Sequence, residues 1–356
     1  MQETKAIVTL AYFQGIGPTR FQDLIKVFKQ PSLILTAKES LLKQVLGKDT
    51  GEKFIRFKNK FNAESEIKKL NDKKIKVISL FDKLYPKELK QIQDPPICLF
   101  VKGSNWKNIY QSRKIAIVGT RKPTVYGQTI TKKLVKDLAD KEITIVSGLA
   151  LGIDTTAHQS ALKNNLATIA VLGCGIDIIY PAINRQLYNE IAKHGAVVSE
   201  FPPGTTVKKG LFISRNRIIS GLSQAVIVVQ GKQNSGSLIT AKYCAEQGRD
   251  LFAVAGNITD PNSFAPNLLI QNGAYPIISV ADLSKYYNLK SKTKLENKTL
   301  NSTEKKIIDL LKEQPMYLEE LKLKLGLTTD KLISTLTLLE LKQLINKEAD
   351  GKIYLA

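Results

Sequence analysis

Seven short runs of apolar, β-branched residues recur through the middle of the chain, and this alternation constrains the fold more than any other feature. Stretches of helical length separate most of the runs, and several runs end in Gly or Ser. The runs lie at 114–119, 143–148, 167–173, 196–200, 225–230, 250–256 and 276–279. Continuous runs of this kind indicate strands that are buried on both faces, as in a parallel sheet covered by helices. The sequence therefore predicts an α/β fold with a Rossmann-like doubly wound sheet.

Helical patterns precede the predicted sheet. Residues 1–65 show short amphipathic helices, and "GIGPTR" at 15–20 predicts a tight turn into the next helix. Such turns occur in helix-hairpin-helix modules, where a helix N-terminus meets a phosphate, and also in plain helix–helix connections. We expect a small helical domain of the SAM or helix-hairpin-helix type over 1–65, followed by the sheet domain over 66–284.

A polar segment, 285–302, separates the sheet from the last part of the chain. It is rich in Lys and Asn and nearly free of aliphatic residues, which indicates a linker. Three helical patterns and a hairpin follow over 303–356, an arrangement typical of a winged helix. Thr328, Thr329 and Asp330 are expected to cap its third helix. Few basic residues are expected on the exposed side of that helix. DNA recognition, protein interaction and simple packing therefore all stay open for this domain.

The charge balance favours an anionic partner without identifying it. Lys and Arg number 53 against 32 acidic residues, a formal net charge of +21. A field of this sign attracts nucleic acids, although lysines on solvated helix faces would give the same total.

Cysteine and histidine usage argues against disulfides and against a metal centre. Cys98, Cys174 and Cys244 are widely spaced in apolar surroundings, as reduced core thiols are. His158 and His194 have no Cys-x-x-Cys companion, so we expect no metal and no cofactor. The first residues lack a signal-peptide pattern and no run nears 18 apolar residues, so we expect a cytoplasmic protein that does not contact a membrane.

Gly-rich turns follow the predicted strands and supply candidate phosphate contacts. The first strand leads into Gly119, Thr120, Arg121 and Lys122. Gly lets a phosphate approach the backbone, the following helix N-terminus donates N–H groups, and Arg121 adds a planar fork. The chain has neither the G-x-G-x-x-G nor the G-x-x-x-x-G-K-S/T pattern, which disfavours ordinary dinucleotide and P-loop sites.

The same arrangement recurs after two further strands. Ser147 and Gly148 end the second strand, and Ser235, Gly236 and Ser237 open the helix that follows the fifth. Because ligands of such sheets bind outside the carboxyl ends of the strands, we expect these hydroxyl and N–H groups to share one rim.

A basic segment precedes the fifth predicted strand. Its candidate DNA contacts are Lys208, Lys209, Phe212, Arg215, Asn216 and Arg217. Cations that track a backbone, beside a ring that stacks a base, are what a binder of single strands needs. We expect residues 215–217 to cap a short helix and to join Arg121 along the rim. In the alternative interpretation, one of the two arginines pairs with Asp154 or Glu200 and holds the sheet edge.

Eight motifs, in order across about 110–275, resemble those of the DprA/Smf family of DNA-processing proteins. They are "IVGTRKPTVYG", "SGLALGIDTTAH", "VLGCGIDIIYPAIN", "SEFPPG", "RNRIISGLS", "SGSLITA", "EQGRDLFAVAG" and "LLIQNGA". The resemblance implies an extended Rossmann core that binds single-stranded DNA without catalysis and forms a homodimer through that core. It also implies that the protein helps to load RecA recombinase onto incoming strands in natural transformation. The positions that match the family's DNA contacts are Arg121, Lys209, Phe212, Arg215 and Arg217.

The chain departs from the family pattern at three positions close to these motifs. Ile213 stands where Pro is frequent, Gln230 where Glu is usual, and Ala255 where Pro is common. Ile213 would loosen the loop before Arg215, and Gln230 would remove a charge near the site.

Two other functions stay open at this point. A nucleotide-processing Rossmann enzyme of the phosphoribohydrolase type would need a carboxylate near the ribose, for which Asp154 and Glu200 are available. Asp154 is otherwise expected to cap a helix that carries a structural His158. Recognition of duplex DNA by the winged helix is disfavoured, because that domain has few basic residues.

Overall fold

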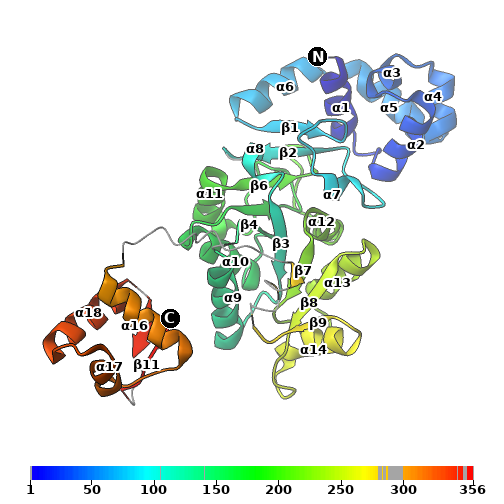
Figure 1. Ribbon diagram of the computed structural model, residues 1–356. Helices are drawn as coiled ribbons and strands as arrows, with labels where there is room; N and C mark the ends of the chain where they lie inside the picture. Colours follow the sequence, from blue (N-terminus) through cyan, green and yellow to red (C-terminus); the bar gives the residue numbers. More distant parts are fainter. Residues whose placement is uncertain are drawn as a thin grey trace. The chain divides into compact units, whose positions relative to one another are not determined.

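The chain divides into two units, 1–292 and 293–356, of which the first holds the N-terminal helices and the sheet. This is a computed structural model that describes residues 2–104, 106–139, 141–279, 283, 286–287, 300–342, 344–347 and 351–355. Figure 1 shows the first unit as a layer of strands with helices on both faces and the N-terminal helices beyond one edge.

Seven parallel strands form the body of the sheet, as the sequence predicted. They are β3 (Arg113–Val118), β4 (Ile143–Ser147), β5 (Thr168–Val171), β6 (Ala196–Ser199), β7 (Ala225–Val228), β8 (Asp250–Val254) and β9 (Tyr275–Ile277). Their order is β6-β5-β4-β3-β7-β8-β9, with every neighbouring pair parallel. The chain therefore moves outward from β3 in both directions, and the switch point lies between β3 and β7.

Two further strands, which the strand prediction missed, extend the sheet beyond β6. These are β1 (Lys76–Ser79) and β2 (Cys98–Lys102), and β2 runs antiparallel to both of its neighbours. β1 has only four residues and two of them are Lys and Ser, so its apolar signal is weak. A short helix, α7 (Lys87–Lys90), lies between them in the chain, and α8 (Trp106–Ile109) follows β2.

Alternate residues of the central strands pack into two different hydrophobic layers. On β3, Ile115 and Ile117 face α9 (Val125–Asp137) and α10 (Ile153–Lys163), whereas Ala116 and Val118 face α12 (Lys209–Leu222) and α13 (Gly236–Glu246). Both faces of the strand are buried, which explains the continuous apolar runs. The other elements of this part are α11 (Arg185–His194), α14 (Phe264–Gln271) and the 3₁₀ turns Ala182–Asn184 and Pro261–Ser263.

The N-terminal helices pack against the β1–β2 edge. They are α1 (Gln2–Tyr12), α2 (Pro18–Phe28), α3 (Pro31–Thr36), α4 (Glu39–Leu46), α5 (Lys48–Lys60) and α6 (Ala63–Asp72). The predicted turn at 15–20 is present, with Gly17 as N-cap and Pro18 at the first helical position of α2. Tyr12 meets Phe100 of β2 edge to face, with ring centroids 6.1 Å apart, so these helices and the sheet share one core.

The second unit has the three helices and the hairpin that a winged helix requires. Its elements are α16 (Ser302–Glu313), α17 (Leu318–Leu325), α18 (Thr329–Leu341), β10 (Ile345–Lys347) and β11 (Ile353–Leu355). Thr328 is the N-cap of α18, but its side chain makes no capping hydrogen bond, so the predicted cap is only positional.

Most of the predicted linker, 285–302, lies outside the described residues. Tyr286 and Tyr287 are described, and both donate hydrogen bonds to the carboxylate of Asp250 on β8. Aromatic packing on Phe252 therefore holds this start of the segment against the sheet.

The three cysteines are buried and form no disulfide. Within the described parts of the chain, no helix is long and apolar enough to cross a membrane. Those same residues hold no cluster of three or more His, Cys, Asp and Glu side chains that could bind a metal ion.

His158 is fully buried on α10 and gives the fold a specific response to acid. Its Nδ1 lies 2.7 Å from the hydroxyl of Thr168, which itself donates to the carbonyl of Ile145, so Nδ1 donates and Nε2 is left without a partner. Burial, with a smaller effect of Arg215, lowers the pKa of His158 from 6.5 to about 3.

We predict that His158→Asn flattens the acid limb of the stability curve. Unfolded histidine gains its proton near pH 6.5, but the folded side chain does not until about pH 3, so the stabilisation is complete above 6.5 and is lost as the pH falls. The wild type should lose up to about 1.4 kcal/mol of unfolding free energy per pH unit more than the variant. Urea denaturation at pH 7, 6, 5 and 4 measures this difference, and parallel curves would contradict it.

Candidate nucleic-acid interface

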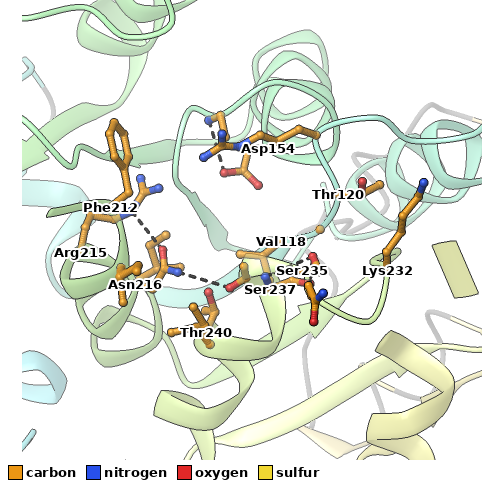
Figure 2. A pocket seen from close by; sticks show the side chains of 18 of the residues that line it. Val118, Thr120, Asp154, Phe212, Arg215, Asn216, Lys232, Ser235, Ser237 and Thr240 are labelled. Carbon is orange, nitrogen blue, oxygen red and sulfur yellow. Dashed lines mark hydrogen bonds between the residues drawn. The ribbon is translucent and has the colours of Figure 1, made fainter. Parts of the chain in front are cut away.

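A crevice of about 1090 Å³ opens at the carboxyl ends of β3 and β7, where the strand order reverses. Many of the predicted contacts line it, namely Gly119, Thr120, Arg121, Lys209, Phe212, Arg215, Asn216, Ser235, Gly236 and Ser237. The predicted contacts Lys122, Ser147, Gly148, Lys208 and Arg217 do not line it. Figure 2 shows the labelled side chains converging on this space from α12, α13 and the strand ends.

The loop after β3 is fixed by backbone contacts. The Thr120 N–H donates to the carbonyl of Gln230 at 2.7 Å, and the Thr120 carbonyl accepts from Ile153 at 3.2 Å. Gly152 has φ +81°, and a Cβ there would lie 2.3 Å from the Thr120 carbonyl oxygen, so only glycine permits this approach. Arg121 is consequently presented on a rigid loop, with its side chain exposed.

Gln230 lies beneath the crevice and not at its rim. The side chain is 1% exposed; its Oε1 accepts from the Thr124 N–H at 3.0 Å and its Nε2 donates to the Thr124 hydroxyl at 2.8 Å. It therefore fixes the N-terminus of α9. The sequence analysis placed Gln230 near the site, and the structure puts this uncharged side chain below the loop that follows β3.

Arg215, Asn216 and Arg217 lie inside α12, so they do not cap a short helix as predicted. The helix spans Lys209–Leu222 and begins six residues before Arg215, because no proline lies between 209 and 214 and the one weak helix former there, Gly210, falls in the first turn. All three side chains are buried. Ile213 is thus a helical residue of the crevice wall and does not loosen a loop.

The Arg215 guanidinium joins α12 to two strand ends. Nη1 donates to the carbonyls of Gly148, at 2.7 Å, and Val171, while Nε contacts the Asn216 amide oxygen at 3.3 Å. A Cβ on Gly148 would lie 2.4 Å from Nη1, so the absence of a side chain at this position makes room for the arginine. Gly148 therefore supports the crevice from below.

Asp154 balances this buried cation. Its Oδ2 accepts from the N–H groups of Gly148, at 3.0 Å, and Ala150, at 3.4 Å, so it holds the β4–α10 loop and does not cap its own helix. Burial raises the pKa of Asp154, and the charge of Arg215 opposes this rise. Burial likewise lowers the pKa of Arg215, to about 10. The predicted contact Ser147 bonds within the sheet: its hydroxyl donates to the Ile117 carbonyl at 2.7 Å.

Arg217 occupies a separate ion-pair cluster, in which the side chains of the arginine and Glu200 are buried and that of Asp94 is partly exposed. Its Nη2 is 2.6 Å from Glu200 Oε2, and its Nε is 2.8 Å from Asp94 Oδ2. The arginine side chain is 4% exposed and the glutamate 9%. The geometry fits the alternative in which one arginine pairs with Glu200 and holds the edge of the sheet.

The N-terminus of α13 forms one wall of the crevice. Ser235 caps the helix, and its hydroxyl lies 2.8 Å from the Ser237 hydroxyl. Asn216 Nδ2 donates to the Gly236 carbonyl at 3.4 Å and links this wall to α12 (Figure 2). The backbone N–H groups of this turn thus stand at the dipole-positive end of a helix, where anions are stabilised.

Two rings and three exposed cations also line the crevice. The rings of Phe212 and Tyr180 lie 5.4 Å apart at 50°, and 44% of Tyr180 is exposed. Arg121, Lys209 and Lys232 are exposed and line the crevice. Among the described residues no ion pair joins these three cations to a carboxylate.

The sequence prediction missed Tyr180 and Lys232. Lys232 lies in the loop four residues after the end of β7, so its place beyond a strand end is a signal that could have found it. Tyr180 lies in a loop after β5 and meets Phe212 only through tertiary folding.

The doubly wound sheet, the crevice lined by cations at its switch point and the winged-helix unit together define a class of Rossmann-like proteins with an added winged helix. The family described as DNA recombination-mediator protein A matches residues 76–288, and the DprA winged helix domain matches 291–351. The chain belongs to this family.

Relatives of this chain carry the names DprA and Smf. It is 49% identical over 209 residues to DNA processing protein DprA of Bacillus subtilis (strain 168), which covers 59% of this chain and 70% of that protein. It is 38% identical over 285 residues to Protein Smf of Synechocystis, covering 78% of this chain and 72% of that protein.

A solved structure of DNA processing protein A from Streptococcus pneumoniae superposes with a TM-score of 0.72 and 34% identity, over 80% of this chain and 98% of that one. The corresponding Helicobacter pylori protein, described as having a unique single-stranded DNA binding mode, superposes with a TM-score of 0.54 and 32% identity, over 60% of this chain and 96% of that one.

We predict that Arg217→Met destabilises the fold by about 3 kcal/mol, because it leaves Glu200 buried without its counter-ion. Adding Glu200→Gln to this variant should restore much of the loss, since it removes the unpaired charge. Urea denaturation of the single and double variants measures both effects. Equal stability of Arg217→Met and the wild type would show that this cluster does not hold the sheet edge.

Proposed function

We propose that the chain binds single-stranded DNA in the crevice and acts as a recombination mediator. The observation that carries this proposal is the pairing of two adjacent rings, the half-buried Phe212 and the exposed Tyr180, with exposed cations that no carboxylate among the described residues neutralises. Cations follow a phosphate backbone, and rings stack unpaired bases that a duplex would hide. The loop after β3 and the N-terminus of α13 add backbone donors on the same edge.

A catalytic role has less support. Of the two carboxylates available for a phosphoribohydrolase-type reaction, Glu200 does not line the crevice and is paired with Arg217. Asp154 lines the crevice, but it is 6% exposed and accepts two backbone hydrogen bonds. A general base must reach the proton that it removes, and neither group is free to do so. We therefore propose a binder that is not an enzyme.

We further propose RecA recombinase as the protein partner, in natural transformation and in the cytoplasm; the description of the family as a DNA recombination mediator is consistent with this proposal. A homodimer through the Rossmann core has support at the β9 edge of the sheet. Tyr275 on β9, the outermost strand at this edge, is 47% exposed, so a large ring is accessible there. An exposed apolar edge is a surface suited to pairing with a second chain.

The winged-helix unit does not share the basic character of the whole chain. Residues 303–356 contain nine Lys, no Arg and nine acidic residues. A domain of zero formal charge lacks the electrostatic footprint of a duplex reader, so we propose that DNA binding resides in the first unit.

The first test is equilibrium binding of labelled poly-dT and of its duplex across a salt series. Replacing Arg121, Lys209 and Lys232 together by Ala should weaken binding and flatten the log–log salt slope for single strands by about 2, because each phosphate contact contributes about 0.7. We expect the wild type to prefer the single strand.

A matched control removes the same charge from the exposed face of α9, as Lys132→Ala, Lys133→Ala and Lys136→Ala. Its slope should stay close to that of the wild type. Equal affinity for duplex DNA, or equal slopes for the two triple variants, would refute a single-strand site in the crevice and favour a small-nucleotide enzyme.

We also predict that Phe212→Ala weakens binding of single strands by about 1–3 kcal/mol without changing the salt slope, since stacking involves no counterion release. Phe212→Trp should retain binding because it keeps a ring beside Tyr180. A flatter salt slope for Phe212→Ala, or full loss of binding for Phe212→Trp, would show that the ring serves packing and does not stack a base.

A further inference from the structure

The turn at 15–20, which the crevice does not use, lines a second concave surface on the N-terminal helices. A cavity of about 590 Å³ lies there, with Arg20 of α2, Lys53 of α5 and Phe57 of α5 among its walls. Arg20 and Lys53 are exposed, and none of the lining residues is acidic. We call this surface the helical cavity.

The helical cavity combines cations with aromatic side chains. Phe13 and Phe57 both line it, with ring centroids 5.4 Å apart, and Phe57 stacks on Phe61 at 4.9 Å and 24°. Arg20 donates from Nη1 to the Gly15 carbonyl at 2.7 Å, which fixes its guanidinium against the turn while its other donors stay available. These residue types match those of the crevice.

A third cavity of about 240 Å³ lies between the helical cavity and the crevice. It shares Phe13 and Gln14 with the helical cavity, and it reaches Lys208 and Leu211 at the start of α12. Their chain neighbours Lys209 and Phe212 line the crevice. The first turn of α12 is therefore flanked by concave surfaces on both sides, with two exposed lysines between them.

The first turn of α12 offers a contact point for a phosphate of a strand that crosses it. Its N-cap is Lys208, which makes no side-chain capping hydrogen bond, so the N-cap residue leaves the first N–H groups of this fourteen-residue helix without a side-chain acceptor. Glu200 is the acidic residue that lines the third cavity, and its charge is paired with that of Arg217. A phosphate backbone that passes here meets positive potential at Lys208 and at the helix end.

We propose that the DNA strand leaves the crevice over the first turn of α12 and continues into the helical cavity, where Arg20 and Lys53 contact its phosphates. This inference rests on the proposed function, because it extends the same bound strand. A single strand suits this route better than an acidic protein segment does, since the cations alternate with rings along it.

The experiment compares a short and a long oligonucleotide. About 6 nucleotides can occupy the crevice alone, whereas about 20 can follow both surfaces, given that single-strand sites span about 4–16 nucleotides per domain. For Arg20→Ala with Lys53→Ala, dT20 should bind about tenfold more weakly with a salt slope lower by about 1.4, because two phosphate contacts are lost. Binding of dT6 should be unchanged.

The matched control is Lys60→Ala with Lys68→Ala, which removes two exposed lysines of the N-terminal helices, on α5 and α6, that do not line the helical cavity. Arg20→Lys with Lys53 retained should recover the dT20 slope. Urea denaturation of each variant shows that the helices still fold.

Each outcome separates the two proposals. Unchanged dT20 binding in the Arg20 and Lys53 variant, with dT6 still dependent on Arg121 and Lys209, would overturn the extended track, leave the crevice site standing and assign the helical cavity to a protein partner. An equal loss of dT6 and dT20 binding would also overturn it. Independence of dT6 from Arg121 and Lys209 would instead refute the crevice as the DNA site.

Discussion

The buried guanidinium of Arg215 is the interaction on which the crevice depends. It draws α12 against the ends of β4 and β5 through the carbonyls of Gly148 and Val171, and Asp154 supplies the opposing charge nearby. A buried cation is tolerated only when hydrogen bonds and a counter-charge offset its desolvation. Because α12 is fixed in this way, Phe212 and Lys209 at its start are held at the carboxyl edge of the sheet.

The topology supplies the space that these contacts shape. Strands run outward in both directions from β3 and β7, so the loops after them separate and leave an opening at the switch point. Backbone groups of the β3 loop and of α13 line that opening together with cations that have no acidic partner in the described residues. Rigid donors and exposed charge at one edge are a general solution for holding phosphates without chemistry.

The cations near the crevice fall into a buried group and an exposed group. Arg215 and Arg217 sit in one helix two residues apart, yet both are buried and each is tied to a different partner set. Arg121, Lys209 and Lys232 are exposed instead. Sequence spacing alone does not separate these groups, because an arginine that holds a sheet edge and one that meets a ligand are both polar residues beside apolar runs.

The sequence by itself determined the parallel sheet, the flanking helices and the winged helix, because a residue period and its burial are local properties of the chain. It also determined that strand ends carry Gly, Ser and Arg at one edge, since parallel strands share their direction. Only the tertiary structure decided that Arg217 faces Glu200 and Asp94, that Gln230 lies under α9, and that Tyr180 meets Phe212. Those pairings join residues far apart in the chain, so their partners are fixed by packing and not by neighbouring residues.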